Sequence, residues 1–174
     1  MKSIGFVVAW AFMASQAFAG DCPWTKASLL DAAKVEETIS KFNEYNPDFL
    51  DQIEGKGFLY FSAIWNPYSK ADLPYMSKGM PKDFTPIYVF AGRQRTDFDE
   101  VEARAYLEDL GAEEWGFYLD RKQKLSNKMR VFGTPVTFFF DKDSGAVAFQ
   151  NGDFKSQKDR FPNFSDYIDA VFCK

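Results

Sequence analysis

Two cysteines are the residues of this chain with the most evident redox chemistry, and they stand at its two ends. Cys22 lies near the N-terminus, and Cys173 is the penultimate of 174 residues. In an oxidising compartment such a pair forms a structural disulfide, which for a loop this long contributes about 4–5 kcal/mol in the chain-entropy model. The alternative is a redox-active pair, which needs a thiolate of lowered pKa. Cys173 ends an amphipathic segment next to Phe172, so we expect the structural bridge.

The chain contains no histidine. This removes the commonest general base and metal ligand and excludes Ser–His and Cys–His catalysis. An acidic stretch runs from Asp97 to Glu114, but it lacks the spacing of a calcium loop and is expected to be a solvated helix face. We predict neither a metal nor a cofactor. The formal net charge of −4 disfavours nucleic acid and anionic membranes as partners.

The first residues have the pattern of a secretory signal peptide. Lys2 is followed by the uncharged apolar run 4–14 and by Ala17-Phe18-Ala19, which offers small residues to a signal peptidase. We predict cleavage after residue 19 or 20, because the run is too short for a stable membrane anchor. The alternative is an uncleaved anchor helix. The mature protein is therefore expected to be exported, in the periplasm or otherwise secreted, with no stable membrane anchor.

Hydrophobic periodicity predicts an alternation of helices and strands. The expected helices cover residues 25–45, 69–84 (interrupted at Pro74), 98–110 and 164–172, and residues 122–130 are expected to form a short polar helix or a turn. The expected strands cover residues 58–64, 87–91, 117–119, 136–140 and 146–150. This order is typical of an α/β fold with helices on both faces of a central sheet. The last two strands flank a turn at 141–145 and form a hairpin, which makes the sheet mixed.

Four stretches in this order resemble the thioredoxin superfamily, and within it the exported TlpA-like or redoxin-like branch. They are Gly55–Trp65 (GKGFLYFSAIW), Asn66–Lys70 (NPYSK), Ile87–Leu110 and Gly133–Asp141 (GTPVTFFFD), the last followed by Gly145. The resemblance covers roughly residues 50–172. It implies a thioredoxin-like three-layer domain at residues 55–174, after a signal peptide at 1–19 and an N-terminal helical extension at 20–54.

The resemblance places the family's CxxC motif at residues 66–69, where this chain has no sulfur. In the family the first cysteine attacks a disulfide and the second releases the product, and both steps require thiols. Here the two positions are Asn66 and Ser69, and no histidine is present to activate the serine. Tyr60 stands where thioredoxins carry a buried acid. The resemblance therefore does not imply an enzyme at this loop.

The resemblance does imply a surface for an extended peptide. In the family, the residue before the cis-proline pairs through its backbone with such a peptide, a contact that needs no sulfur. The expected partner-binding residues are Trp65, Asn66, Pro67, Tyr68, Ser69, Thr134 and Pro135.

The leading hypothesis is a redox-inactive, exported binder of a peptide or protein partner, chaperone-like or an assembly factor. One alternative is a thiol–disulfide oxidoreductase that uses Cys22 and Cys173. Another is a small-molecule carrier with an aromatic cleft. A third is that Trp65 and Pro135 serve only the fold.

Overall fold

The computed structural model describes residues 32–44, 50, 53–92, 98–143 and 145–172. Its helices are α1 (Ala32–Glu44), α2 (Pro67–Lys78), α3 (Glu100–Asp109), the 3-10 turn η3 (Arg121–Gln123), α4 (Lys124–Lys128), α5 (Lys155–Arg160) and α6 (Phe164–Val171). Its strands are β1 (Lys56–Ser62), β2 (Phe84–Phe90), β3 (Gly116–Leu119), β4 (Val136–Asp141) and β5 (Gly145–Asn151). No helix among the described residues is long and apolar enough to cross a membrane.

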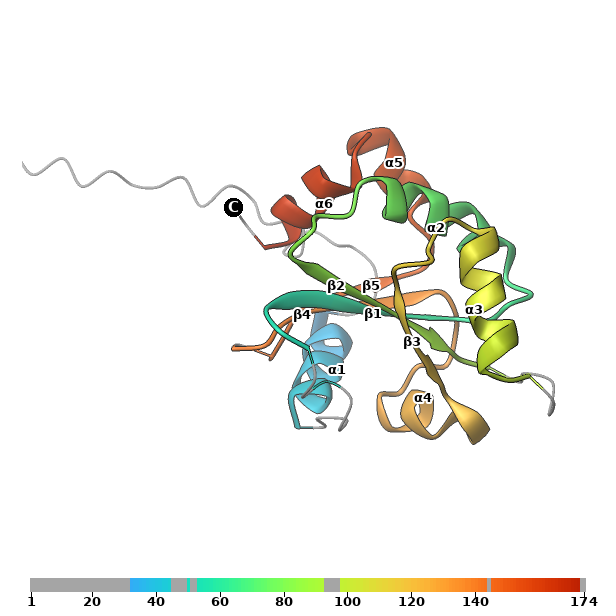
Figure 1. Cartoon of the computed structure of the whole chain (residues 1–174). Coiled ribbons are helices and arrows are strands. Elements are labelled where there is room, and N and C mark those ends of the chain that lie inside the picture. Colours follow the sequence, from blue (N-terminus) through green and yellow to red (C-terminus); the bar gives the residue numbers. More distant parts are fainter. Residues whose placement is uncertain (1–31, 45–49, 51–52, 93–97, 144, 173–174) are drawn as a thin grey trace, which may run out of the picture.

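The five strands form one mixed sheet in the order β3-β2-β1-β4-β5. Strand β2 is parallel to β1 and β3, whereas β4 is antiparallel to β1 and β5. Figure 1 shows α2, α5 and α6 above the sheet, with α1 and α4 below it. The predicted three-layer architecture, with a mixed sheet between helices, is confirmed.

The central strand β1 is buried on both faces, as its continuous apolar run predicts. Phe58 and Tyr60 belong to the core cluster on the side of α2, α3 and α6. Leu59 and Phe61 belong to the cluster on the side of α1 and α4. All four side chains have no exposed surface, so β1 fixes the point from which the following loop departs.

Helix α1 packs directly on the sheet through Phe42. Its ring stacks on that of Phe138 in β4, with centroids 5.6 Å apart and planes at 10°. Asn43 next to it accepts the N–H of Ala146, the second residue of edge strand β5, at 2.5 Å. The described part of the predicted N-terminal extension is therefore helix α1, which covers part of the lower face of the sheet in Figure 1.

The structure differs from the expected helices in two places. Helix α2 ends at Lys78 and does not continue to Phe84, which begins β2. At Gly79 a Cβ would lie 2.7 Å from the backbone nitrogen of Phe164, so this close contact requires glycine, and Pro81 cannot extend a helix. The short helix α5 was not expected, because its sequence KSQKDR has no apolar residue to produce a periodic signal.

The acidic stretch contributes a helix cap. Asp99 accepts two N–H groups of the first turn of α3, at 2.9 and 3.0 Å, and the Glu102 side chain accepts the Asp99 N–H at 3.3 Å. This reciprocal capping box fixes where α3 begins.

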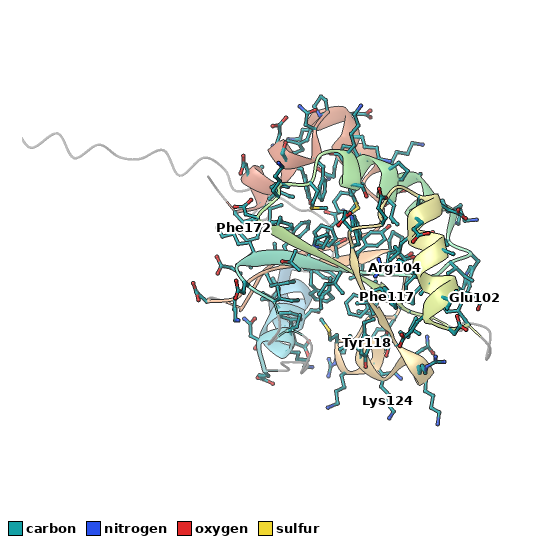
Figure 2. All side chains as sticks on the ribbon, in the orientation of Figure 1. Glu102, Arg104, Phe117, Tyr118, Lys124 and Phe172 are labelled. Carbon is teal, nitrogen blue, oxygen red and sulfur yellow. The ribbon has the colours of Figure 1, made fainter. Side chains whose placement is uncertain are left out.

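Arg104 donates to the carbonyl of Trp115 at 3.0 Å and stacks over Phe117, joining α3 to β3 (Figure 2). Among the described residues, no group of three or more His, Cys, Asp or Glu side chains could hold a metal ion.

Candidate functional site

The loop between β1 and α2 holds the residues that the sequence places at the CxxC position. Asn66 has an extended backbone (φ −73, ψ 115), and its side-chain oxygen accepts the N–H of Tyr68 at 2.9 Å. This is the contact of an N-cap residue. Pro67 follows at the first helical position, where a missing N–H costs nothing. The pair Asn-Pro therefore starts α2 without any cysteine.

Asn66 also connects this loop to the loop before β4. Its amide nitrogen donates to the carbonyl oxygen of Thr134 at 3.0 Å and lies 3.2 Å from the Thr134 hydroxyl. We call these two contacts the Asn66–Thr134 clasp. The peptide bond between Thr134 and Pro135 is cis, as the resemblance implies. The clasp thus joins the start of α2 to the cis-proline loop, 68 residues further along the chain.

Ser69 is fully buried and faces the protein interior. Its hydroxyl donates to the carbonyl oxygen of Asn66 at 2.9 Å and lies 3.4 Å from the hydroxyl of Tyr106. A serine that bonds to its own helix turn and touches no base has neither the access nor the activation of a nucleophile. At this position the side chain stabilises the first turn of α2.

Two aromatic residues of the loop face solvent. The exposed fractions are 56% for Trp65 and 54% for Tyr68. The Trp65 ring lies over Gly92 at the end of β2, where a Cβ would meet the indole carbons at 3.2 Å. Gly92 also has a φ of +87, a conformation that favours glycine. The aromatic surface is thus positioned by the backbone beneath it.

The seven predicted binding residues divide into two groups. Trp65, Pro67 and Tyr68 are exposed and Thr134 is half-buried, so these four lie wholly or partly at the surface. Asn66, Ser69 and Pro135 are the buried members and shape the loop from within.

Of the two hydrogen-bonding groups of the Thr134 backbone, one is bonded and the other is not, among the residues that the structure describes. Its carbonyl oxygen, which the resemblance assigns to a bound peptide, already accepts the Asn66 amide. Its N–H has no hydrogen-bond partner among the described residues. An extended chain could therefore dock by placing a carbonyl oxygen against this N–H.

Sequence reasoning missed Phe132, which is 85% exposed and precedes the cis-proline loop by two residues. It lines a groove of about 430 Å³ between α1, β5 and the loop that follows α4. A single phenylalanine in a polar loop gives no periodic signal, so its exposure could not be read from the pattern.

A buried acid lies behind the loop, although not at the strand position that the family uses. The hydroxyl of Tyr60 in β1 donates to Asp72 of α2 at 3.1 Å. Asp72 is 1% exposed, accepts the N–H of Phe154, and lies 3.4 Å from the Lys158 ammonium. Burial raises the pKa of the Asp72 carboxyl, and the Phe154 N–H and Lys158 oppose the shift. Burial, followed by the Asp72 charge, raises the pKa of Tyr60.

The predicted disulfide between Cys22 and Cys173 falls outside the described residues. It therefore stays a prediction, as does the signal peptide.

No protein-family profile matches the chain, and no curated protein matches it significantly. Solved structures do match it. A secreted Mycobacterium tuberculosis disulfide oxidoreductase homologous to E. coli DsbE is 16% identical (TM-score 0.54; 69% of this chain, 85% of that chain). A Chlorobium tepidum protein, provisionally described as the thiol:disulfide interchange protein DsbE, is 20% identical (TM-score 0.54; 71% and 84%). StoA from Bacillus subtilis is 13% identical (TM-score 0.50; 67% and 84%).

These matches establish the class of fold. The chain has a thioredoxin-like fold, similar to that of proteins described as disulfide oxidoreductases. At such low identities the likeness extends to the arrangement of strands and helices and not to activity.

Proposed function

We propose that this protein is an exported, thioredoxin-like binder of an extended polypeptide, without thiol–disulfide activity at its loop. The observation that carries the proposal is the state of the two positions where the family has sulfur. Asn66 and Ser69 are buried and bonded within the loop, whereas Trp65 and Tyr68 beside them are more than half exposed. The loop keeps a contact surface and has no reactive group.

The chemistry of the surface suggests how such a partner would bind. Exposed aromatic rings contribute large contact areas at a low cost in side-chain entropy. The N–H of Thr134 would donate one hydrogen bond to a backbone carbonyl oxygen of a chain in extended conformation. The export signal that the sequence predicts, and the secreted Mycobacterium tuberculosis neighbour, favour a partner outside the cytoplasm.

A photocrosslinker placed at position 68 tests this proposal in the cell. We expect a crosslinked adduct that disappears when Trp65→Ala and Thr134→Pro are introduced, the second removing the free N–H. The same crosslinker at Lys142, an exposed residue of the β4–β5 turn, is the matched control and should give no such adduct. Adducts of equal intensity at both positions, or adducts that survive both substitutions, would refute the proposal.

An oxidoreductase that uses Cys22 and Cys173 is the second candidate, because the structural neighbours are described as proteins of that activity. Insulin reduction by the mature protein discriminates between the two functions. Turnover that is abolished by Cys173→Ser would favour the oxidoreductase. A reduction potential well below that of thioredoxin, about −270 mV, with no turnover would favour a structural bridge.

A further inference from the structure

A strongly basic segment lies on the opposite side of the sheet from α2. Residues 121–130, RKQKLSNKMR, carry five basic side chains and no acidic one, in a chain whose formal net charge is −4. All five side chains are exposed. We call these residues the basic face: Arg121, Lys122, Lys124, Lys128 and Arg130. Figure 2 shows Lys124 on the outside of α4, away from the sheet.

The segment that carries the basic face is anchored on its side toward the sheet. The buried carboxylate of Asp120 accepts the N–H of Leu125 at 2.8 Å, the N–H of Ser126 at 2.8 Å and the hydroxyl of Ser126 at 2.5 Å. Leu125 and Met129 anchor α4 in the lower core cluster. A partner would therefore meet a backbone that is already ordered, and only the exposed side chains would lose freedom on binding.

The backbone of this segment adopts costly conformations. Lys122, Gln123 and Arg130 have φ values of 62, 55 and 54, in the left-handed region that favours glycine. Such conformations are unfavourable for residues other than glycine. Backbone strain of this kind is common at functional sites.

Most of these charges are not neutralised within the protein. Arg130 pairs with Glu37 of α1 at 2.6 Å. Arg121, Lys122 and Lys124 have no ion-pair partner among the described residues. Like charges on residues so near in sequence repel one another, and a bound anionic group would reduce that repulsion.

A groove of about 430 Å³ with a mixed polar and apolar lining adjoins the basic face at Arg130. Its apolar side chains are Val131, Phe132, Val136 and Phe149. Glu37 also lines it, and the charge of this carboxylate is paired with Arg130 and Lys41. Phe132 stands at 85% exposure on this groove. Charged and apolar contacts are therefore available side by side, which is the arrangement that an acidic segment with one apolar side chain would fit.

We propose that the basic face and this groove bind an acidic, extended polypeptide segment that places one apolar side chain against Phe132. Such a segment would contact only the basic face and the adjoining groove. An anionic membrane is a flat surface that would also meet the acidic remainder of this chain, so it fits the charge distribution less well. The proposal goes beyond the loop of Trp65 and Tyr68, because none of the residues of that loop takes part.

Fluorescence anisotropy with defined peptides tests the proposal. The probe is a short labelled polyglutamate peptide with one central phenylalanine, compared with the same peptide carrying alanine at the centre. We expect binding that weakens as salt is added. Arg121→Glu combined with Lys124→Glu should lower the affinity about tenfold, and Phe132→Ala should lower it about fivefold and only for the phenylalanine peptide.

The matched control reverses two exposed lysines elsewhere, Lys142→Glu with Lys155→Glu, and changes the net charge equally. It should leave the affinity unchanged. Equal losses in both double variants would show attraction by net charge alone and overturn the proposal. It would also be overturned if the protein bound phosphatidylglycerol vesicles but not the peptide. A Trp65→Ala variant with unaltered peptide affinity keeps the result separate from the proposed function of the loop.

Discussion

Replacing Asn66 with alanine measures the energy that the Asn66–Thr134 clasp contributes. The substitution removes three hydrogen bonds: one to the Tyr68 N–H and two to Thr134. Loss of an N-cap costs about 1 kcal/mol. Loss of the contacts to Thr134 costs about 1–2 kcal/mol more. Asn66 is only 6% exposed, and its removal leaves the partly buried Thr134 carbonyl without a donor. We expect a total of about 2–3 kcal/mol.

Two further variants separate the cap from the clasp. Asn66→Ser keeps an oxygen that can cap α2, but its side chain is too short to donate to Thr134, so we expect a loss of about 1–2 kcal/mol. Asp99→Ala removes the cap of α3, which has no bond to another loop among the described residues. That change should cost about 1 kcal/mol.

Urea denaturation provides the measurement. The urea midpoint should decrease least for Asp99→Ala, more for Asn66→Ser and most for Asn66→Ala, and the m-value should not change. In thermal unfolding, Asn66→Ala should lower Tm by about 4–12 °C for a chain of this length. If Asn66→Ala costs no more than Asp99→Ala, or if Asn66→Ser is as stable as the wild type, the clasp does not stabilise the fold as argued.

Two more predictions concern the same part of the molecule. Asn66→Cys with Ser69→Cys should form a disulfide and reduce insulin above the wild-type level, because thiols at the start of α2 gain thiolate character there; a folded but inactive double variant would show that the loop geometry is not that of a redox site. Burial raises the pKa of Asp72 in the folded state, so ionisation of this carboxyl destabilises the fold. Relative to Asp72→Asn, wild-type stability should therefore be highest below about pH 4, the unfolded pKa, and fall as pH rises through the raised folded value, as urea midpoints measured across this range would show.

Much of the fold could be predicted because its signals are local. The run from Phe58 to Ile64 is apolar at every position but one, and only a strand covered on both faces buries such a run. The sequence Gly133-Thr134-Pro135 precedes another such strand, and the structure places a cis bond there. In both cases a few adjacent residues determine the conformation.

For the site, the sequence predicted which residues belong to it but not their contacts, because those contacts join residues that are distant in the sequence. The clasp links positions 68 residues apart, and the bond of Tyr60 to Asp72 depends on how α2 packs over β1. Neither contact follows from periodicity. The basic face was not predicted for a different reason. The net charge of −4 is a sum over the whole chain, and it hides the five positive charges that residues 121–130 carry.

The replacement of sulfur changes the mechanics of the loop as well as its reactivity. A cysteine at position 66 could donate only weakly to the Thr134 carbonyl, whereas the amide of Asn66 donates to Thr134 and caps α2 at the same time. The side chain that removes the nucleophile therefore also fastens the cis-proline loop to the helix. A loop fixed in this way presents Trp65 and Tyr68 in one arrangement, which favours binding over exchange chemistry, since exchange would require the clasp to be replaced by a covalent bond to the substrate.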